Sequence, residues 1–280
     1  MRDRLFVRLA LPLVLALIGA AGCTVESSPN EAREADRLLS QVRDRVIRDN
    51  TGTFNSELHF GDVNLVWGGD YWLREARAKL RIQVVQHRHG DFWTDFEVVL
   101  DGTKAYLRKF FYFAKRRWIP MTKRHIFADL QCWPARNRRL PDRMLMLLFN
   151  AEAQGFERDE GRSFIVATVP ARLTIGVFPD PRIAELISRE GSRPVKLLIG
   201  HFRGRLTTLE LQGRAVKSAL QRSGVRLDAN LARKLQHANY NAWYSEYDDP
   251  RRMRPPGLDR LVEPGNNPLS PRQLCNPTII

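Results

Sequence analysis

The sequence predicts an α+β fold in which helices cover one face of an antiparallel β-sheet. Three observations support this prediction. An amphipathic helical pattern occupies residues 31–50, several segments with strand-like alternation follow it, and two short helical patterns precede a last strand pattern that ends near residue 247. Strands that follow one another through tight turns pair antiparallel, and an amphipathic helix buries its apolar stripe against such a sheet.

The first 22 residues have the layout of a secretory signal peptide. Arg2, Arg4 and Arg8 precede an uncharged apolar run from Leu9 to Ala21. This run has about 13 residues, fewer than the roughly 20 that a membrane-spanning helix needs, and no later stretch is long and apolar enough to span a bilayer. We therefore expect residues 1–22 to be a leader that is removed on export.

The apolar run ends in Ala20-Ala21-Gly22-Cys23, which resembles the bacterial lipobox. In that motif small residues admit the signal peptidase, and the cysteine thiol receives a diacylglyceryl group. Two acyl chains anchor a protein stably, because each buried methylene contributes about 0.8 kcal/mol. The resemblance implies a lipoprotein that carries palmitate-type chains at Cys23 and is held on the extracytoplasmic face of the cell membrane. Ala20 stands where the motif usually has Leu, so simple cleavage into the secreted fraction is the alternative.

The other two cysteines, Cys132 and Cys275, belong to the exported part of the chain. Oxidising conditions outside the cytoplasm favour a disulfide between them. Such a bond would hold the C-terminal tail against the middle of the chain. Two unpaired thiols are the alternative.

The exported chain is strongly basic. The whole chain carries 45 Lys and Arg against 31 Asp and Glu, a net charge of +14, and the loss of three arginines and one aspartate with the leader lowers this charge to +12. In a cytoplasmic protein this charge would suggest nucleic acid, but an exported chain meets anionic headgroups or cell-wall polymers instead. We expect no nucleic-acid partner, and either an anionic membrane surface as a partner or simply a well-solvated surface.

The segment after the lipobox predicts a tether and then a helix. Residues 23–30 are small and polar, which is typical of a short lipidated tether. From Glu31 onward apolar residues recur every three or four positions as far as Ile47, and Asn50-Thr51-Gly52 ends the pattern. We expect this amphipathic helix to pack on the sheet.

A period of two governs the next fifty residues, as in half-buried strands. Turn signals fall at Gly61-Asp62, Gly68-Gly69-Asp70, His89-Gly90-Asp91 and Asp101-Gly102, and the last of these is a strong signal for a two-residue hairpin. The segment predicts an antiparallel meander with one wet face and one apolar face. The apolar face is a candidate ligand lining or, alternatively, an ordinary filled core. Its members are Leu58, Phe60, Leu80, Ile82, Val84, Phe96, Val98, Leu100 and Leu107.

Residues 115–143 have a loop-like and very basic sequence, with Trp118 and Trp133 among the cations. Cations together with tryptophans suit a membrane surface, where each charge contributes about 1 kcal/mol near anionic lipid. Ordinary solvated loops are the alternative. The candidate basic surface consists of Arg116, Arg117, Lys123, Arg124, Arg136, Arg138 and Arg139.

The second half of the chain alternates strand and helix patterns. Asp228 is a plausible N-cap for the last helix, and residues 251–280 form an irregular Pro/Arg-rich tail. Without a fixed repeat or a Pro/Ser-rich linker, residues 31–250 predict one ligand-binding domain. The expected helices are 143–149, 180–189, 214–222 and 228–236, and the expected strands are 164–168, 173–177, 195–199, 206–211 and 240–247.

The sequence shows no motif of a common enzyme site. It has no nucleophile elbow, no phosphate-binding or dinucleotide-binding glycine loop and no paired carboxylates in a catalytic context. His87 and His89 lie near Asp91 on one strand face, but a third metal ligand is not evident. We expect a protein that is not an enzyme and that uses neither a cofactor nor a metal.

Four segments resemble the LolA/LolB-like fold, and especially the actinobacterial LppX/LprG-type lipoproteins. They are 69–72, 99–108, 209–213 and 238–247. With the lipobox, the likeness spans most of residues 35–250. It implies a strongly curved, incompletely closed β-barrel with helices over the opening, and an apolar cavity that holds acylated lipids. The segment Phe110-Phe111-Tyr112-Phe113 and the C-terminal tail have no counterpart in that family.

These patterns favour a membrane-anchored lipoprotein that binds a lipid or other amphiphile in an apolar cavity and carries or presents it. No catalytic group is required, because burial of methylenes supplies the affinity. The alternative is a cell-envelope interaction module in which the basic loops dock on a membrane, a wall polymer or a protein partner and the sheet is only a scaffold.

Overall fold

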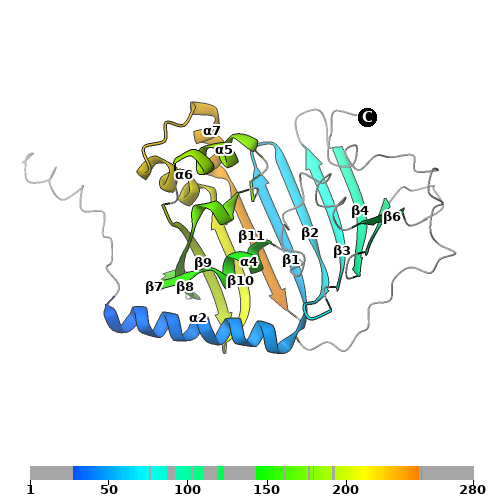
Figure 1. The fold of residues 1–280 in the computed structure, drawn as a ribbon, viewed down its shortest axis with the longest axis horizontal. Helices are drawn as coiled ribbons and strands as arrows, with labels where there is room; N and C mark the ends of the chain where they lie inside the picture. Colours follow the sequence, from blue (N-terminus) through cyan, green and yellow to red (C-terminus); the bar gives the residue numbers. More distant parts are fainter. Residues whose placement is uncertain are drawn as a thin grey trace, which may run out of the picture.

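The computed structural model describes residues 28–75, 77–86, 92–101, 104–109, 119–122, 143–159, 162–175, 177–178, 180–190, 193–245 and 247. Within these residues eleven strands form one antiparallel sheet, whose order is β6-β5-β4-β3-β2-β1-β11-β10-β9-β8-β7. The two edge strands, β6 and β7, do not pair with each other, so the sheet is open. The predicted α+β class with an unclosed antiparallel sheet and covering helices is confirmed (Figure 1).

The last of the described strands joins two meanders. Because β11 lies between β1 and β10, it connects the meander β1–β6 to the meander β7–β10. The strands are β1 (Thr51–Phe60), β2 (Val63–Trp72), β3 (Arg77–Gln86), β4 (Phe92–Asp101), β5 (Lys104–Lys109), β6 (Ile119–Thr122), β7 (Glu152–Asp159), β8 (Arg162–Val169), β9 (Val195–Phe202), β10 (Arg205–Gln212) and β11 (Asn239–Ser245).

The helices gather at two ends of the sheet and over its middle. In Figure 1, α2 runs along one end, α5, α6 and α7 lie at the opposite end, and α4 lies across the strands between them. The described helices are α2 (Pro29–Asp49), α4 (Arg143–Phe149), α5 (Pro181–Glu190), α6 (Gly213–Arg222) and α7 (Ala229–His237), with a 3-10 turn η1 (Ala171–Thr174). None of them is long and apolar enough to cross a membrane.

Capping residues set the limits of two predicted helices. Ser28 and Glu31 form a capping box at the start of α2, where the Glu31 amide donates to Ser28 Oγ at 3.3 Å and the Ser28 amide donates to Glu31 Oε2 at 3.0 Å. Asn50, with a left-handed φ of 61°, ends this helix as predicted. Asp228 is the N-cap of α7 and accepts from the Leu231 amide at 2.8 Å, which confirms its predicted role.

Helix α2 packs against both an edge strand and more central strands of the sheet. Its apolar stripe, with Ala35, Leu39, Val42 and Val46 almost completely buried, packs on β7, β8 and β10. The Arg43 guanidinium donates to the carbonyl oxygens of Leu148, at 3.0 Å, and Ala151. These bonds satisfy backbone groups at the end of α4, which fixes α4 against α2.

The predicted turn at Gly68-Gly69-Asp70 is wrong, because β2 continues through these residues. A Cβ atom on Gly68 would lie 2.6 Å from the Phe54 carbonyl oxygen, and one on Gly69 would lie 1.9 Å from the Lys79 carbonyl oxygen. Gly69 also has a φ of +150°, which favours glycine. The two glycines therefore allow β1, β2 and β3 to approach closely and do not reverse the chain.

Three further local predictions need correction. Residues 173–177 do not form a strand, because Ala171–Thr174 is a 3-10 turn in which buried Thr174 donates to the Ala171 carbonyl. The basic region 115–143 contains the short strand β6. Strand β7 was not predicted, because its register shift between Ala153 and Gly155 interrupts the period of two.

Candidate ligand-binding face

One face of the sheet is apolar over eight of its strands. Alternate residues of each strand point to this face, as the pleat requires, and their side chains are between 0% and 5% exposed. From β4 to β8 they include Val98, Leu100, Ala78, Leu80, Leu65, Trp67, Tyr71, Phe54, Leu58, Phe60, Tyr240, Ala242, Tyr244, Leu209, Leu211, Leu197, Ile199, Ile165 and Ala167. We call this surface the inner face.

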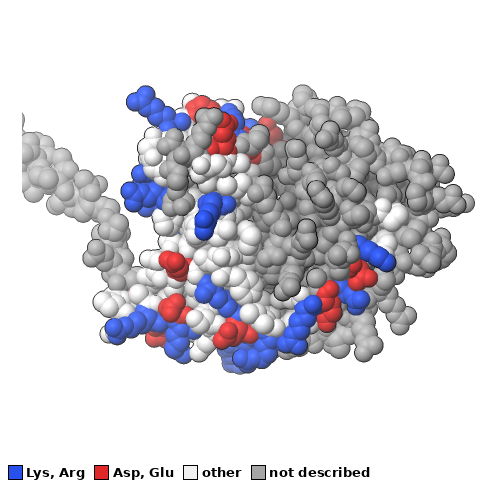
Figure 2. Space-filling view, in the orientation of Figure 1, with Lys and Arg blue, Asp and Glu red and all other residues white. Residues whose placement is uncertain are grey.

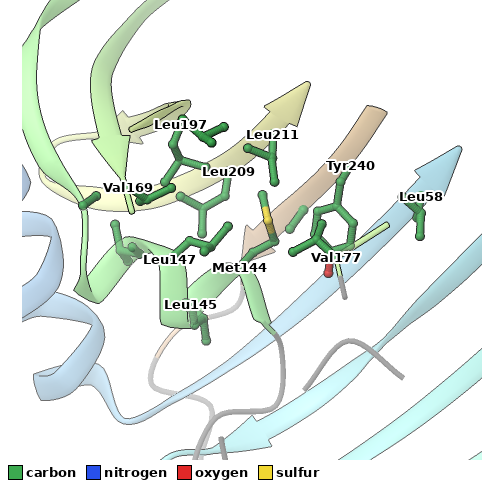
Figure 3. Close-up of a cluster of buried hydrophobic side chains, with 14 of the residues drawn as sticks. Leu58, Met144, Leu145, Leu147, Val169, Val177, Leu197, Leu209, Leu211 and Tyr240 are labelled. Atoms are coloured by element: carbon green, nitrogen blue, oxygen red, sulfur yellow. The ribbon is translucent and has the colours of Figure 1, made fainter. Parts of the chain in front are cut away.

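Helix α4 covers the part of the inner face around β9, β10 and β11. Figure 3 shows Met144 and Leu147 between the helix and the strand residues Leu197 and Leu209, whereas Leu145 extends from the other side of the helix. All three side chains are fully buried. A helix that is apolar on every side is an internal element, so α4 is part of the core and not a surface lid.

Aromatic rings concentrate in the middle of the inner face. The ring centroids of Trp67 and Tyr240 are 5.1 Å apart, and those of Phe54 and Tyr71 are 6.1 Å apart. The ring of Phe60 packs against that of Phe178, which precedes α5, with ring centroids 5.8 Å apart. Each such pair contributes about 0.5–1.5 kcal/mol beyond the burial of its area. The rings therefore hold the centre of the sheet in a defined arrangement.

A polar spot interrupts this aromatic centre. The indole nitrogen Nε1 of Trp67 is buried and has no hydrogen-bond partner among the described residues, and the whole residue is only 1% exposed. Ser56, which is 0% exposed, is the residue paired with Trp67 across β1 and β2. An unpaired buried donor costs about 1–3 kcal/mol. An acceptor oxygen of a bound molecule would remove this cost.

The predicted lining residues lie on the inner face wherever their side chains are described. Leu58, Phe60, Leu80, Val98 and Leu100 are at most 4% exposed and belong to the buried core. Ile82, Val84, Phe96 and Leu107 occupy β3, β4 and β5, but their side chains lie outside the described residues. The role of these nine residues as a ligand lining stays a prediction.

A small pocket of about 220 Å³ lies on β1, β2 and β3. Five of its lining residues belong to the outer face by parity, namely Asn55, Val66, Gly68, Arg81 and Gln83, and the other three are Phe54, Trp67 and Gly69. None of the nine predicted residues lines it. The pocket belongs to the part of these strands around Gly68 and Gly69, which have no side chains.

A buried charged group joins α2 to the sheet at the opposite end from α7. The Asp49 carboxylate lies 3.7 Å from Arg205 Nε and 4.0 Å from Arg45 Nε. The Tyr247 hydroxyl donates to the Leu206 carbonyl oxygen. Burial, with smaller effects of Tyr71 and Asp49, raises the pKa of Tyr247 far above its usual range. These contacts are structural, because they fix the end of the sheet.

Several residues proposed from the sequence lie outside the described part of the chain. They are Cys23, Cys132, Cys275, His87, His89, Asp91 and the seven cations Arg116, Arg117, Lys123, Arg124, Arg136, Arg138 and Arg139. Among the residues that are described, no group of three or more His, Cys, Asp or Glu side chains could hold a metal ion.

Sequence reasoning missed Trp67, Ser56 and Tyr240 as site residues. Leu65, Trp67 and Tyr71 share one parity, which is a strand signal, but the assumed turn at Gly68-Gly69 concealed it. Tyr240 lay in a predicted strand whose neighbours were unknown. Only the sheet order, with β11 beside β1, brings it to Trp67.

Comparison with known proteins shows a distant structural likeness. No family model matches the chain, and no curated protein matches its sequence. Among solved structures, the fold is similar to that of the Mycobacterium tuberculosis lipoprotein LppX, with a TM-score of 0.39 and 13% sequence identity. The similarity covers 78% of this chain and 98% of the LppX chain.

Proposed function

We propose that this chain is an exported lipoprotein that binds a lipid or other amphiphile against the inner face of its sheet and carries or presents it at the membrane. The observation that carries the proposal is the buried and unpaired indole N–H of Trp67, at the centre of a wide apolar face. An amphiphile has both parts that this arrangement calls for, an apolar chain and an acceptor oxygen near the start of that chain.

The binding energy would come from the apolar chain, and the orientation from the polar spot. Each methylene transferred from water to the inner face contributes about 0.8 kcal/mol. A hydrogen bond from Trp67 Nε1 to an ester or hydroxyl oxygen contributes about 1 kcal/mol. The predicted lining residues whose side chains are described would contact the acyl chain, because they lie on the face that holds Trp67. They are Leu58, Phe60, Leu80, Val98 and Leu100.

The anchor would keep this site beside its source of ligand. In the proposed lipoprotein the acylated Cys23 stands five residues before Ser28, the cap of α2. Five extended residues reach at most about 18 Å. The folded part would therefore stay within a short distance of the bilayer surface, where amphiphiles are available.

The test uses the exported chain with Cys23→Ser, which removes the anchor and keeps the rest of the protein. We expect native mass spectrometry of this protein, purified without detergent, to show a bound lipid. Trp67→Phe should lower lipid affinity about five-fold, because it removes one hydrogen bond worth about 1 kcal/mol. Trp243→Phe is the matched control, since Trp243 is 40% exposed and its parity places it on the outer face.

Two results would contradict the proposal. One is a protein that retains no lipid and takes up none from vesicles. The other is an equal loss of affinity in the Trp67 and Trp243 variants, which would mean that the inner face does not hold the ligand.

A further inference from the structure

The tight turn between β9 and β10 exposes an aromatic side chain at its tip. Phe202 is 64% exposed, the largest value among the large apolar side chains of the described residues. The next residue, Arg203, holds its guanidinium carbon 5.2 Å from the centre of the Phe202 ring. Arg203 and Gly204 both have left-handed backbones, with φ of 51° and 75°, which is the geometry of a type I′ hairpin.

The residue type at position 203 is unusual for this turn. The first central position of a type I′ turn favours Asn, Asp or Gly, because other side chains pay a conformational cost in the left-handed region. An arginine here destabilises the turn relative to asparagine. The combination of a strained arginine and an exposed phenylalanine indicates a role outside folding.

Helix α2 brings more cations to this turn. A Cβ atom on Gly204 would lie 4.0 Å from the Gln41 side-chain oxygen, so the turn lies beside the second half of α2. Residues 41–49 and 202–205 together contain five arginines and two aspartates, a net charge of +3. Of these two acids, Asp49 is buried between Arg45 and Arg205, and Asp44 is exposed. Figure 2 shows Lys and Arg side chains, with Asp and Glu side chains between them, along the edge of the molecule that α2 forms.

We propose that Phe202, Arg203, Arg205, Arg45 and Arg48 form a docking surface for an anionic lipid bilayer. An aromatic ring at the tip of a turn can enter the headgroup region, where aromatic side chains are favoured. The surrounding arginines attract anionic headgroups. The net positive charge and the exposed aromatic tip match the chemistry of such a surface, which is charged at its boundary and apolar immediately below.

The geometry of α2 agrees with this docking surface. Gln41 lies about 18 Å along the helix from Pro29, at 1.5 Å per residue. This inference rests on the proposed function only in that export would place the chain beside a membrane. With α2 parallel to the bilayer, an anchor before Ser28 and the Phe202 turn would touch the same surface.

The test measures binding of the exported chain, with Cys23→Ser, to phosphatidylcholine vesicles with and without phosphatidylglycerol. We expect binding only to the anionic vesicles, and a loss of affinity of about ten-fold in Phe202→Ser and in Arg203→Asn. Arg203→Asn should at the same time stabilise the fold, because asparagine suits the turn, so its weaker binding could not be attributed to unfolding. Trp243→Ser, on the outer face of the sheet, should bind like the parent chain.

Three results would overturn the inference. They are a parent chain that does not bind, equal binding to both kinds of vesicle, and unchanged binding of both turn variants. The same variants separate this inference from the proposed function. If native mass spectrometry shows retained lipid in Phe202→Ser while vesicle binding is lost, both proposals hold. Vesicle binding without any retained lipid would contradict the proposed function alone.

Discussion

The indole ring of Trp67 on β2 packs against the phenol ring of Tyr240 on β11, with ring centroids 5.1 Å apart and ring planes inclined by 52°. Strand β1 lies between these two strands, so the rings meet across it. Ser56 of β1 is paired with Trp67 on one side and with Ala242 on the other. Its small side chain leaves the space in which the two rings approach each other.

We predict that Ser56→Leu lowers the free energy of unfolding by about 1–3 kcal/mol, because a larger side chain overpacks this position. It should also weaken the near-ultraviolet circular dichroism of the aromatic centre. Ser56→Ala is the control and should retain the aromatic signal, since it adds no volume. Urea denaturation of both variants checks the prediction, and a Ser56→Leu variant as stable as the parent chain would contradict it.

Gly69 tests the close approach of β2 and β3. We predict that Gly69→Ala costs at least about 2 kcal/mol of stability, because φ is unfavourable and the new Cβ would lie 1.9 Å from the Lys79 carbonyl oxygen. Gly224→Ala should cost only about 1 kcal/mol, since φ is +84° but nothing lies within 4 Å of the new atom. Denaturation curves that rank the two variants in the opposite order would show that the strands do not approach in this way.

The stability of the protein at high pH should depend on Tyr247. Burial raises the pKa of this phenol, so the folded state retains its proton while the unfolded chain loses it near pH 10. The unfolding free energy should therefore be unaffected below pH 10 and should fall as the pH rises above it. Tyr247→Phe should remove this dependence and cost about 1 kcal/mol at neutral pH, where it loses the bond to the Leu206 carbonyl. Titration of all six tyrosines near pH 10 in the folded protein would refute this.

His201 should make the protein sensitive to mild acid. Burial lowers the pKa of its imidazole, and its Nδ1 atom has no hydrogen-bond partner among the described residues. The unfolded chain binds a proton near pH 6.5 and the folded chain does so only at lower pH. This contribution to stability is thus present above pH 6.5 and is lost as the pH falls. His201→Gln should weaken the pH dependence of the unfolding free energy between pH 6.5 and lower pH, as measured by urea denaturation. If the variant and the parent chain lose stability equally as the pH falls, His201 is not the group responsible.

Much of the architecture follows from local sequence patterns. The capping box at Ser28, the left-handed Asn50 and the N-cap Asp228 determine where helices begin or end, and each signal involves residues only a few positions apart. Such signals depend on nearby backbone groups and are therefore visible in the sequence. The alternation of apolar and polar residues predicted β1, β3, β4 and β5, because it too depends only on residues that are close in the sequence.

Features that depend on distant contacts could not be predicted in this way. Gly68 and Gly69 have the composition of a turn, and only the carbonyl oxygens of Phe54 and Lys79 show that they are needed inside a strand. The pairing of Trp67 with Tyr240 depends on the position of β11 between β1 and β10, across more than 170 residues of chain. The inner face was predictable as a surface, but its aromatic centre and its unpaired N–H were not.

The Trp67 indole N–H is proposed to be the polar contact of a lipid on the inner face. The NMR resonance of this N–H group tests the proposal most directly. The chain has six tryptophans, and Trp67→Phe would assign the signal in a proton–nitrogen spectrum of the Cys23→Ser protein. On delipidation and re-addition of extracted lipid, we predict that this one resonance moves downfield as the N–H gains an acceptor, while that of Trp243 stays in place. A Trp67 resonance that is identical with and without lipid would contradict the account.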